Sequence, residues 1–276
     1  MTTLSLGYSP CPNDTYIFHA LIHGLVACGD LTFAERLEDV ETLNQLAVDG
    51  VLDLTKISFH AFGHVRDKYL LLRSGAALGR GCGPLIIADG SVSLKQLEGK
   101  TIAIPGRLTT ANLLLQLYFH GADKLLTLPF DQIIDAVLQG RAAAGVIIHE
   151  SRFTYQQHGL HQLLDLGQWW EEETGHPIPL GGILAKRSLG EERIRQVDQA
   201  LRQSIEYARA HPQEAVDYIR RHAQELDDTV IRRHIGLYVN DYSVDLGDEG
   251  LAAIDCLLGK AGQIGIIPSV DLPLTL

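Results

Sequence analysis

Apolar and polar residues alternate along the chain with two different periods, one typical of strands and one typical of helices. Leu4 and Leu6 alternate with polar neighbours, which is the pattern of a half-buried β-strand. Beyond residue 15, apolar side chains recur at i, i+3, i+4, i+7 and i+8, the period of an amphipathic helix. These helical positions are Phe18, Leu21, Ile22, Leu25 and Val26. The N-terminal segment therefore predicts a strand, a loop and a helix.

Strand and helix patterns continue to alternate as far as about residue 90. Val40 begins a helical pattern that stops at Gly50. Apolar runs of strand length occupy residues 31–37, 52–57, 69–72 and 84–88. Such an alternation predicts a mostly parallel sheet that is covered by helices on both faces.

A second set of strands and helices follows a linker at residues 89–91. Its strand patterns lie at 101–104 and 142–148, and its helix patterns run from Thr109 to Gly121 and over 130–138. A strand at 181–185 then returns toward the first set, and the pattern is helical from Gly190 onward. We therefore predict one α/β lobe made of residues 1–90 and 186–276, and a second, inserted α/β lobe made of residues 91–185.

The loop at residues 9–15 is stiffer than an ordinary turn. Pro10 and Pro12 each fix φ and remove a backbone donor. In open α/β sheets, a first strand that leads through such a loop to a helix N-terminus often borders a ligand crevice. A simple capped turn is the alternative, because Asn13, Asp14 and Thr15 are all residue types that cap helices.

Composition narrows the range of partners. The chain has 276 residues, of which 46% are hydrophobic and 21% charged, as in a soluble globular protein. The net charge of −11 argues against nucleic-acid binding, which needs a basic face. We expect no membrane contact, since no apolar run approaches the roughly 18 residues of a spanning helix. The four dispersed cysteines and the lack of a signal-peptide pattern favour reduced thiols and a cytoplasmic location.

Five segments together resemble the 1,4-dihydroxy-6-naphthoate synthase family of the futalosine route to menaquinone. In chain order they are SPCPNDTYIF (9–18), KISFH (56–60), LLLRSG (70–75), GRGCGP (79–84) and GVIIHE (145–150). The resemblance extends through nearly the whole chain. It implies a bilobal fold similar to type II periplasmic binding proteins, with a ligand cleft between the two α/β lobes. It also implies a reaction that breaks the carbon framework of a spirocyclic precursor and aromatises its second ring.

His149 is the first candidate for catalysis. It follows a buried strand of small and β-branched residues, so it is expected at the carboxyl edge of a sheet. Histidine is the side chain best matched to proton transfer near neutral pH. The alternative is an ordinary packing histidine, since the chain contains twelve. The resemblance implies that His149 is the proton acceptor.

Thr109 and Thr110 are candidates for carboxylate binding. They begin a helix just after a strand and a Pro-Gly turn, and a helix N-terminus attracts anions. Plain N-capping is the alternative, and it needs only one of the two hydroxyls. The resemblance implies that this pair binds the substrate.

Lys56, Ile57 and Ser58 end a predicted strand of the first lobe. Lys56 is able to neutralise an anion, and Ser58 to hydrogen-bond a ligand oxygen. The alternative for Lys56 is a solvated surface position. The resemblance implies that the three residues form a binding segment, and Asn13 in the opening loop is a further binding candidate.

The sequence gives no sign of a cofactor or a metal site. Residues 79–83 are glycine-rich but precede a strand, whereas a dinucleotide loop opens a helix after one. The histidine pairs at 19 and 23 and at 60 and 64 lack the glutamate of H-E-x-x-H. We therefore expect an enzyme that uses neither.

The leading hypothesis is a cofactor-free carbon–carbon lyase that acts on a small carboxylated substrate, cyclic dehypoxanthine futalosine. The second is a non-catalytic protein that binds a small carboxylated ligand, since one fold hosts many functions. The third is another enzyme of the same route, such as chorismate dehydratase, whose opening segment is unlike SPCPND.

Overall fold

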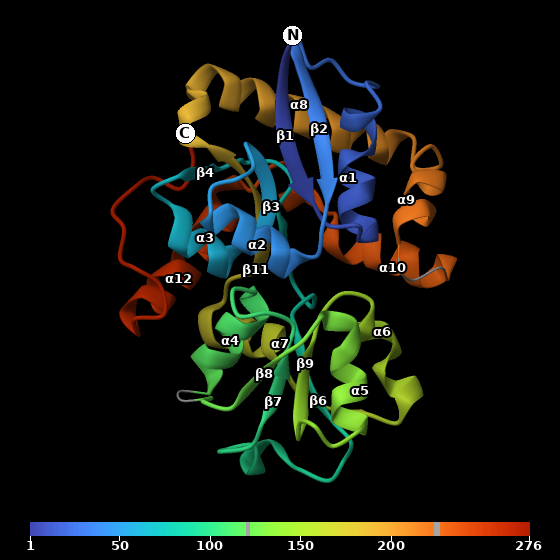
Figure 1. Cartoon of the computed structure of the whole chain (residues 1–276), viewed down its shortest axis with the longest axis vertical. Coiled ribbons are helices and arrows are strands. Elements are labelled where there is room, and N and C mark those ends of the chain that lie inside the picture. The colour runs from blue at the N-terminus through green and yellow to red at the C-terminus, as the bar shows by residue number, and fades with distance from the viewer. Residues whose placement is uncertain (120–121, 224–226) are drawn as a thin grey trace. The chain divides into compact units, whose positions relative to one another are not determined.

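The computed structural model describes residues 1–119, 122–223 and 227–276, and it consists of two compact α/β units (Figure 1). The first unit contains residues 1–79 and 179–276, and the second contains residues 80–178. The second unit is therefore inserted between the two segments of the first. The strand at 85–88, which we assigned to the first lobe, belongs instead to the second unit, because its hydrogen-bonding partners lie there.

The first unit combines one sheet with helices that come largely from the C-terminal half of the chain. Its strands are β1 (Thr2–Tyr8), β2 (Leu31–Leu37), β3 (Leu54–Ser58), β4 (Tyr69–Leu71), β5 (Ala77–Gly79) and β11 (Ile178–Lys186). Its helices are α1 (Pro12–Ile22), α2 (Val40–Val48), α3 (Phe59–Val65), α8 (Glu191–Ala210), α9 (Val216–His222), α10 (Asp228–Tyr238), α11 (Asp241–Val244) and α12 (Gly247–Gln263), with a 3-10 turn at Arg187–Leu189.

The sheet of the first unit is mixed. Its strands lie in the order β2-β1-β3-β11-β4, and β5 pairs with β11. β1 is parallel to β2 and β3, whereas β11 is antiparallel to β3 and β4. The prediction of a mostly parallel sheet was therefore wrong. Only β1, β2 and β3 are joined by the helical crossovers that parallel pairing requires. β11 follows the second unit along the chain and pairs antiparallel with its neighbours.

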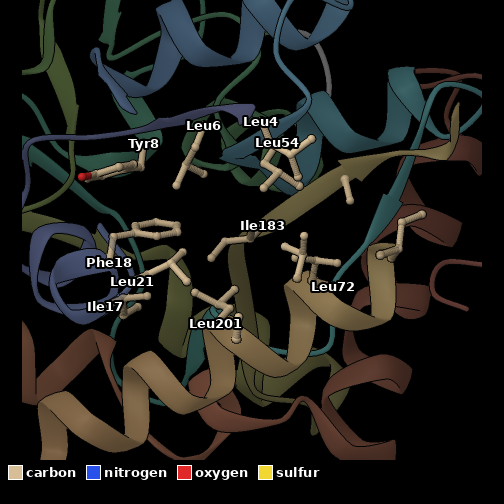
Figure 2. Packing of buried hydrophobic residues seen from close by; sticks show 14 of the residues in the cluster. Leu4, Leu6, Tyr8, Ile17, Phe18, Leu21, Leu54, Leu72, Ile183 and Leu201 are labelled. Carbon is tan, nitrogen blue, oxygen red and sulfur yellow. The ribbon is translucent and has the colours of Figure 1, made fainter. Parts of the chain in front are cut away.

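The core of the first unit lies between its sheet and the helices α1 and α8. In Figure 2, Leu4, Leu6 and Leu54 extend from the strands toward Phe18 of α1 and Leu201 of α8, and all five are almost fully buried. Each such side chain contributes about 1.5–3 kcal/mol to stability. This packing holds the first turn of α1, and with it the opening loop, against the carboxyl ends of β1 and β3.

The second unit has a sheet of its own. Its strands are β6 (Leu85–Ala88), β7 (Ile102–Ile104), β8 (Leu125–Thr127), β9 (Ala144–Ile147) and β10 (His161–Asp165). Its helices are α4 (Thr110–Tyr118), α5 (Ile133–Leu138), α6 (Ser151–Thr154) and α7 (Leu166–Thr174), with 3-10 turns at Leu94–Gln96, Phe130–Gln132 and Tyr155–His158. The expected end of a helix at Gly121 falls outside the described residues, and α4 ends at Tyr118.

The strand order of the second sheet is β10-β6-β9-β7-β8. β7 is parallel to β8 and β9, while β6 is antiparallel to both of its neighbours. The carboxyl ends of β7 and β9 therefore lie side by side, and the candidate residues of this unit follow them after short turns. Across the ranges that the structure describes, no helix is long and apolar enough to cross a membrane.

Candidate active site

The opening loop of the first unit is closed by backbone hydrogen bonds and not by a side-chain cap. Cys11 occupies the N-cap position of α1, and its side chain makes no capping bond. Its carbonyl accepts from the N–H groups of Asp14 and Thr15, both at 3.0 Å. The side chains of Asn13 and Asp14 are therefore available for other partners, and capping does not explain Asn13.

Asp14 is the centre of a buried polar cluster. One carboxylate oxygen accepts from the backbone N–H and the hydroxyl of Ser9, at 3.2 and 2.7 Å. The other accepts from the side-chain amide of Asn13 at 2.6 Å and from the ammonium group of Lys56. A carboxylate with this many donors, including a cation, is stable away from water. The cluster ties the first turn of α1 to the end of β3.

Lys56 is not a solvated surface residue, because only 7% of it is exposed. Its charge is balanced within the first unit by Asp14. A buried lysine of this kind needs such a partner, since removing one member of a buried ion pair leaves an uncompensated charge. Any ligand that contacts Lys56 therefore meets a salt bridge, not an isolated cation.

Ser58 is held by Asn44 of α2. Its backbone N–H donates to Asn44 Oδ1 at 2.9 Å, and the Asn44 amide donates to Ser58 Oγ at 3.3 Å. Neighbouring strand residues point to opposite faces, so Lys56 and Ser58 share one face of β3 and Ile57 points to the other. Ile57 is almost completely buried, with 1% of the residue exposed.

In the second unit, Thr109 caps the helix α4. Its hydroxyl accepts from the Asn112 N–H at 3.2 Å and donates to the Gly106 carbonyl at 2.8 Å. Thr110 is the first residue of the helix, and both threonines are buried. The capping interpretation thus holds for Thr109, while Thr110 stands at the positive end of the helix dipole.

His149 follows β9 and adopts a left-handed backbone conformation, with φ of 56°. Within the described ranges it is the one non-glycine residue with positive φ. Its half-buried ring contacts Phe130 edge to face, with centroids 4.9 Å apart. Residues held in sparsely populated backbone regions cluster at functional sites, where the surrounding structure maintains the strain.

The turn after His149 is fastened by Arg152. The guanidinium pairs with Asp165 at 2.7 Å, and it also donates to the carbonyls of Gly81 and Gly83. The glycine-rich segment is therefore a structural anchor for this turn. Burial raises the pKa of the neighbouring Cys82 thiol to about 12, so this cysteine stays protonated and unreactive at neutral pH.

Comparison with known proteins adds evidence of a different kind. The model of a protein family described as menaquinone biosynthesis matches residues 4–263. The chain belongs to this menaquinone-biosynthesis family. It is 53% identical over 274 residues to 1,4-dihydroxy-6-naphthoate synthase of Thermus thermophilus, with 99% of each chain covered. It is 44% identical over 276 residues to the same-named enzyme of Streptomyces coelicolor, with 97% of this chain and 96% of the relative covered.

Solved structures share the fold of this chain. A protein from Archaeoglobus fulgidus superposes with a TM-score of 0.90 at 38% identity, covering 96% of this chain and 98% of that one. The periplasmic aliphatic sulphonate binding protein of Escherichia coli superposes with a TM-score of 0.65 at 13% identity, covering 99% and 93%. The second similarity concerns the fold alone. The predicted fold class is confirmed, and this member of the menaquinone-biosynthesis family is an enzyme.

Some residues of this family member's candidate site were missed by sequence reasoning. Asp14 lies inside the SPCPND segment, and Asn44 is an amide in the helix that precedes β3, so each of them gave a weak signal in the sequence. His234 of α10 left none. Its ring nitrogen lies 2.8 Å from Asn13 Oδ1, a contact across 221 positions of sequence.

Proposed function

We propose that this enzyme is a lyase that converts cyclic dehypoxanthine futalosine to 1,4-dihydroxy-6-naphthoate, with His149 as the general base and without a cofactor. The names of the two curated relatives support the product, and the five sequence segments support the substrate. The observation that carries the role of His149 is its strained backbone at the carboxyl end of β9. We also propose that the enzyme works in the cytoplasm, where its thiols stay reduced.

The N-terminus of α4 is the proposed site for the substrate carboxylate. It follows β7, and β7 is the parallel neighbour of β9, so this helix end and His149 lie at the same edge of one sheet. The helix dipole and the Thr110 hydroxyl favour an anion here. Thr109 supports the site by capping the helix, since its hydroxyl accepts from the Asn112 N–H of α4 and donates to the Gly106 carbonyl of the loop.

We propose that Lys56, Ser58 and Asn13 of the first unit bind polar groups of the same substrate, and that Ile57 contributes through its backbone. Lys56 and Asn13 are both bonded to Asp14, so their positions are set before the substrate arrives. A preorganised polar cluster does not need to rearrange during the reaction, which favours the transition state.

The decisive experiment follows naphthoate formation by ultraviolet absorbance with the purified protein and the cyclic precursor. We expect turnover by the wild type and a loss in kcat of about 10²–10⁴ in His149→Ala, the usual contribution of general acid–base catalysis. The product should still bind this variant. His158→Ala is the matched control, because His158 is an exposed histidine of the same unit, and it should leave turnover unchanged.

The alternative of a protein that only captures a small carboxylated ligand conflicts with the enzyme names of both relatives. It predicts a different result in the same assay. The wild type would then bind the precursor without consuming it, and His149→Ala would lose affinity only. Absence of any spectral change over hours at high protein concentration would overturn the lyase proposal.

A further inference from the structure

The buried polar cluster of the first unit continues beyond the residues assigned to substrate binding. It runs from Lys56 to Asp14, from Asp14 to Asn13, and from Asn13 to His234 of α10. His234 has no exposed surface. Its ring packs beside that of Tyr238, one helical turn further along, with centroids 4.7 Å apart.

The chemistry of the neighbouring groups fixes the direction of each hydrogen bond. A carboxylate only accepts, so the Asn13 amide nitrogen must point to Asp14. The amide oxygen of Asn13 then faces His234 and must accept. The Nε2 atom of His234 therefore carries a proton and donates it to Asn13.

This donor controls the orientation of the Asn13 side chain. Without it, the amide oxygen of Asn13 would be a buried acceptor with no hydrogen-bond donor, which costs about 1–3 kcal/mol. Rotation of the side chain is the route by which Asn13 would recover a partner. Rotation would withdraw the amide nitrogen from Asp14, and Asp14 is the group that holds Lys56.

We propose that His234 is a positioning residue for substrate binding, which acts through Asn13 and Asp14 on Lys56. The inference rests on the proposed function, because it assigns a consequence to the binding role of Lys56 and Asn13. It differs from a packing role for the same ring in one respect. A packing role depends on ring volume, whereas the positioning role depends on the donated proton.

The test is a double-mutant cycle between His234 and Asn13 in the naphthoate assay. His234→Leu keeps bulk without the donor, and we expect KM to rise about tenfold, a typical coupling within one hydrogen-bond network. His234→Gln should restore most of the affinity, because its amide is able to donate. In the Asn13→Ala background, His234→Leu should add little, since its target is gone.

His19→Gln is the matched control. His19 is another buried histidine of the first unit, and its ring contacts His23 and Tyr218 instead of the polar cluster. We expect its KM to equal that of the wild type. An unchanged KM in His234→Leu, failure of His234→Gln to rescue, or effects of the two substitutions that simply multiply would each overturn the inference.

Failure of the proposed function would look different. A wild type without turnover would overturn the lyase proposal, whatever the variants do.

The hydrogen bond between His234 and Asn13 is tested without turnover, from ¹⁵N spectra of the histidine rings. Asn13→Ala should shift one Nε2–H resonance, the same one that is missing in His234→Gln, and an unshifted spectrum would exclude the link. That readout also applies if His234→Leu does not fold.

Discussion

At the scale of single residues, backbone strain and candidate chemistry coincide at His149. A left-handed conformation costs an L-residue about 1–2 kcal/mol, because Cβ approaches the following carbonyl. The conformation is held by the contact of the ring with Phe130 and by the hydrogen bond from the Arg152 N–H to the His149 carbonyl, at 3.3 Å. A general base is useful only when its ring has one orientation, and this turn supplies it.

This strain predicts an unusual order of stability among variants. His149→Gly should be more stable than His149→Ala by about 1 kcal/mol in urea unfolding, since glycine adopts positive φ without penalty. Both should lack turnover. At His158, which ends a 3-10 turn, the order should reverse and alanine should be the more stable replacement. Equal stabilities of the two His149 variants would contradict a strained backbone.

At the scale of elements, the second unit depends on a close approach of two backbones. Gly83 precedes β6, and a Cβ atom on it would lie 2.3 Å from the Cα of Gly167 in α7. A Cβ atom on Gly167 would lie 2.7 Å from the Cα of Gly83. Neither backbone has room to move independently, because the Gly83 carbonyl accepts from Arg152 and Leu166 donates to Pro84. The turn that carries His149 therefore depends on this crossing.

Gly167→Ala should destabilise the protein by about 1–3 kcal/mol, the usual cost of overpacking. It should also lower turnover, since displacement of Gly83 moves a partner of Arg152. Gly236→Ala in α10 is the matched control, because nothing lies within 4 Å of its Cβ position. The control should gain up to about 1 kcal/mol from helix propensity. Thermal unfolding measures both changes, and a loss of stability in Gly236→Ala alone would reverse the argument.

At the scale of the whole molecule, the sequence predicts helices and strands better than it predicts which strands pair and which side chains meet. The strand β3 and the helix α2 follow from local patterns, because β3 is a short buried run and α2 repeats its apolar residues with a helical period. The assignment of β6 failed, since an apolar run does not say which sheet it joins. The same limit applies to the site. His149 is predictable from its place after a strand, whereas the bond between His234 and Asn13 depends on tertiary packing alone.

Buried histidines give the whole molecule a predictable response to acid. Burial lowers the pKa of His19, the nearby His23 and Arg221 lower it further, and Glu214 opposes the shift. Burial also lowers the pKa of His64. As the pH falls through about 6.5, the unfolded chain binds protons at these positions before the folded protein does. Stability contributed by the neutral rings is therefore present above that pH and is lost below it.

The variant His19→Gln isolates this effect, because its side chain is polar and does not titrate. Between about pH 7.5 and about pH 5.5, on either side of the ordinary histidine pKa, the free energy of unfolding should fall less steeply in the variant than in the wild type. Adding His64→Gln should flatten the curve further, since the two rings lie on different helices, α1 and α3, and titrate separately. Urea titrations at four or five pH values measure the slopes. Parallel curves for wild type and His19→Gln would mean that folding leaves the proton affinity of this histidine unchanged, and the acid response would then have to come from other groups.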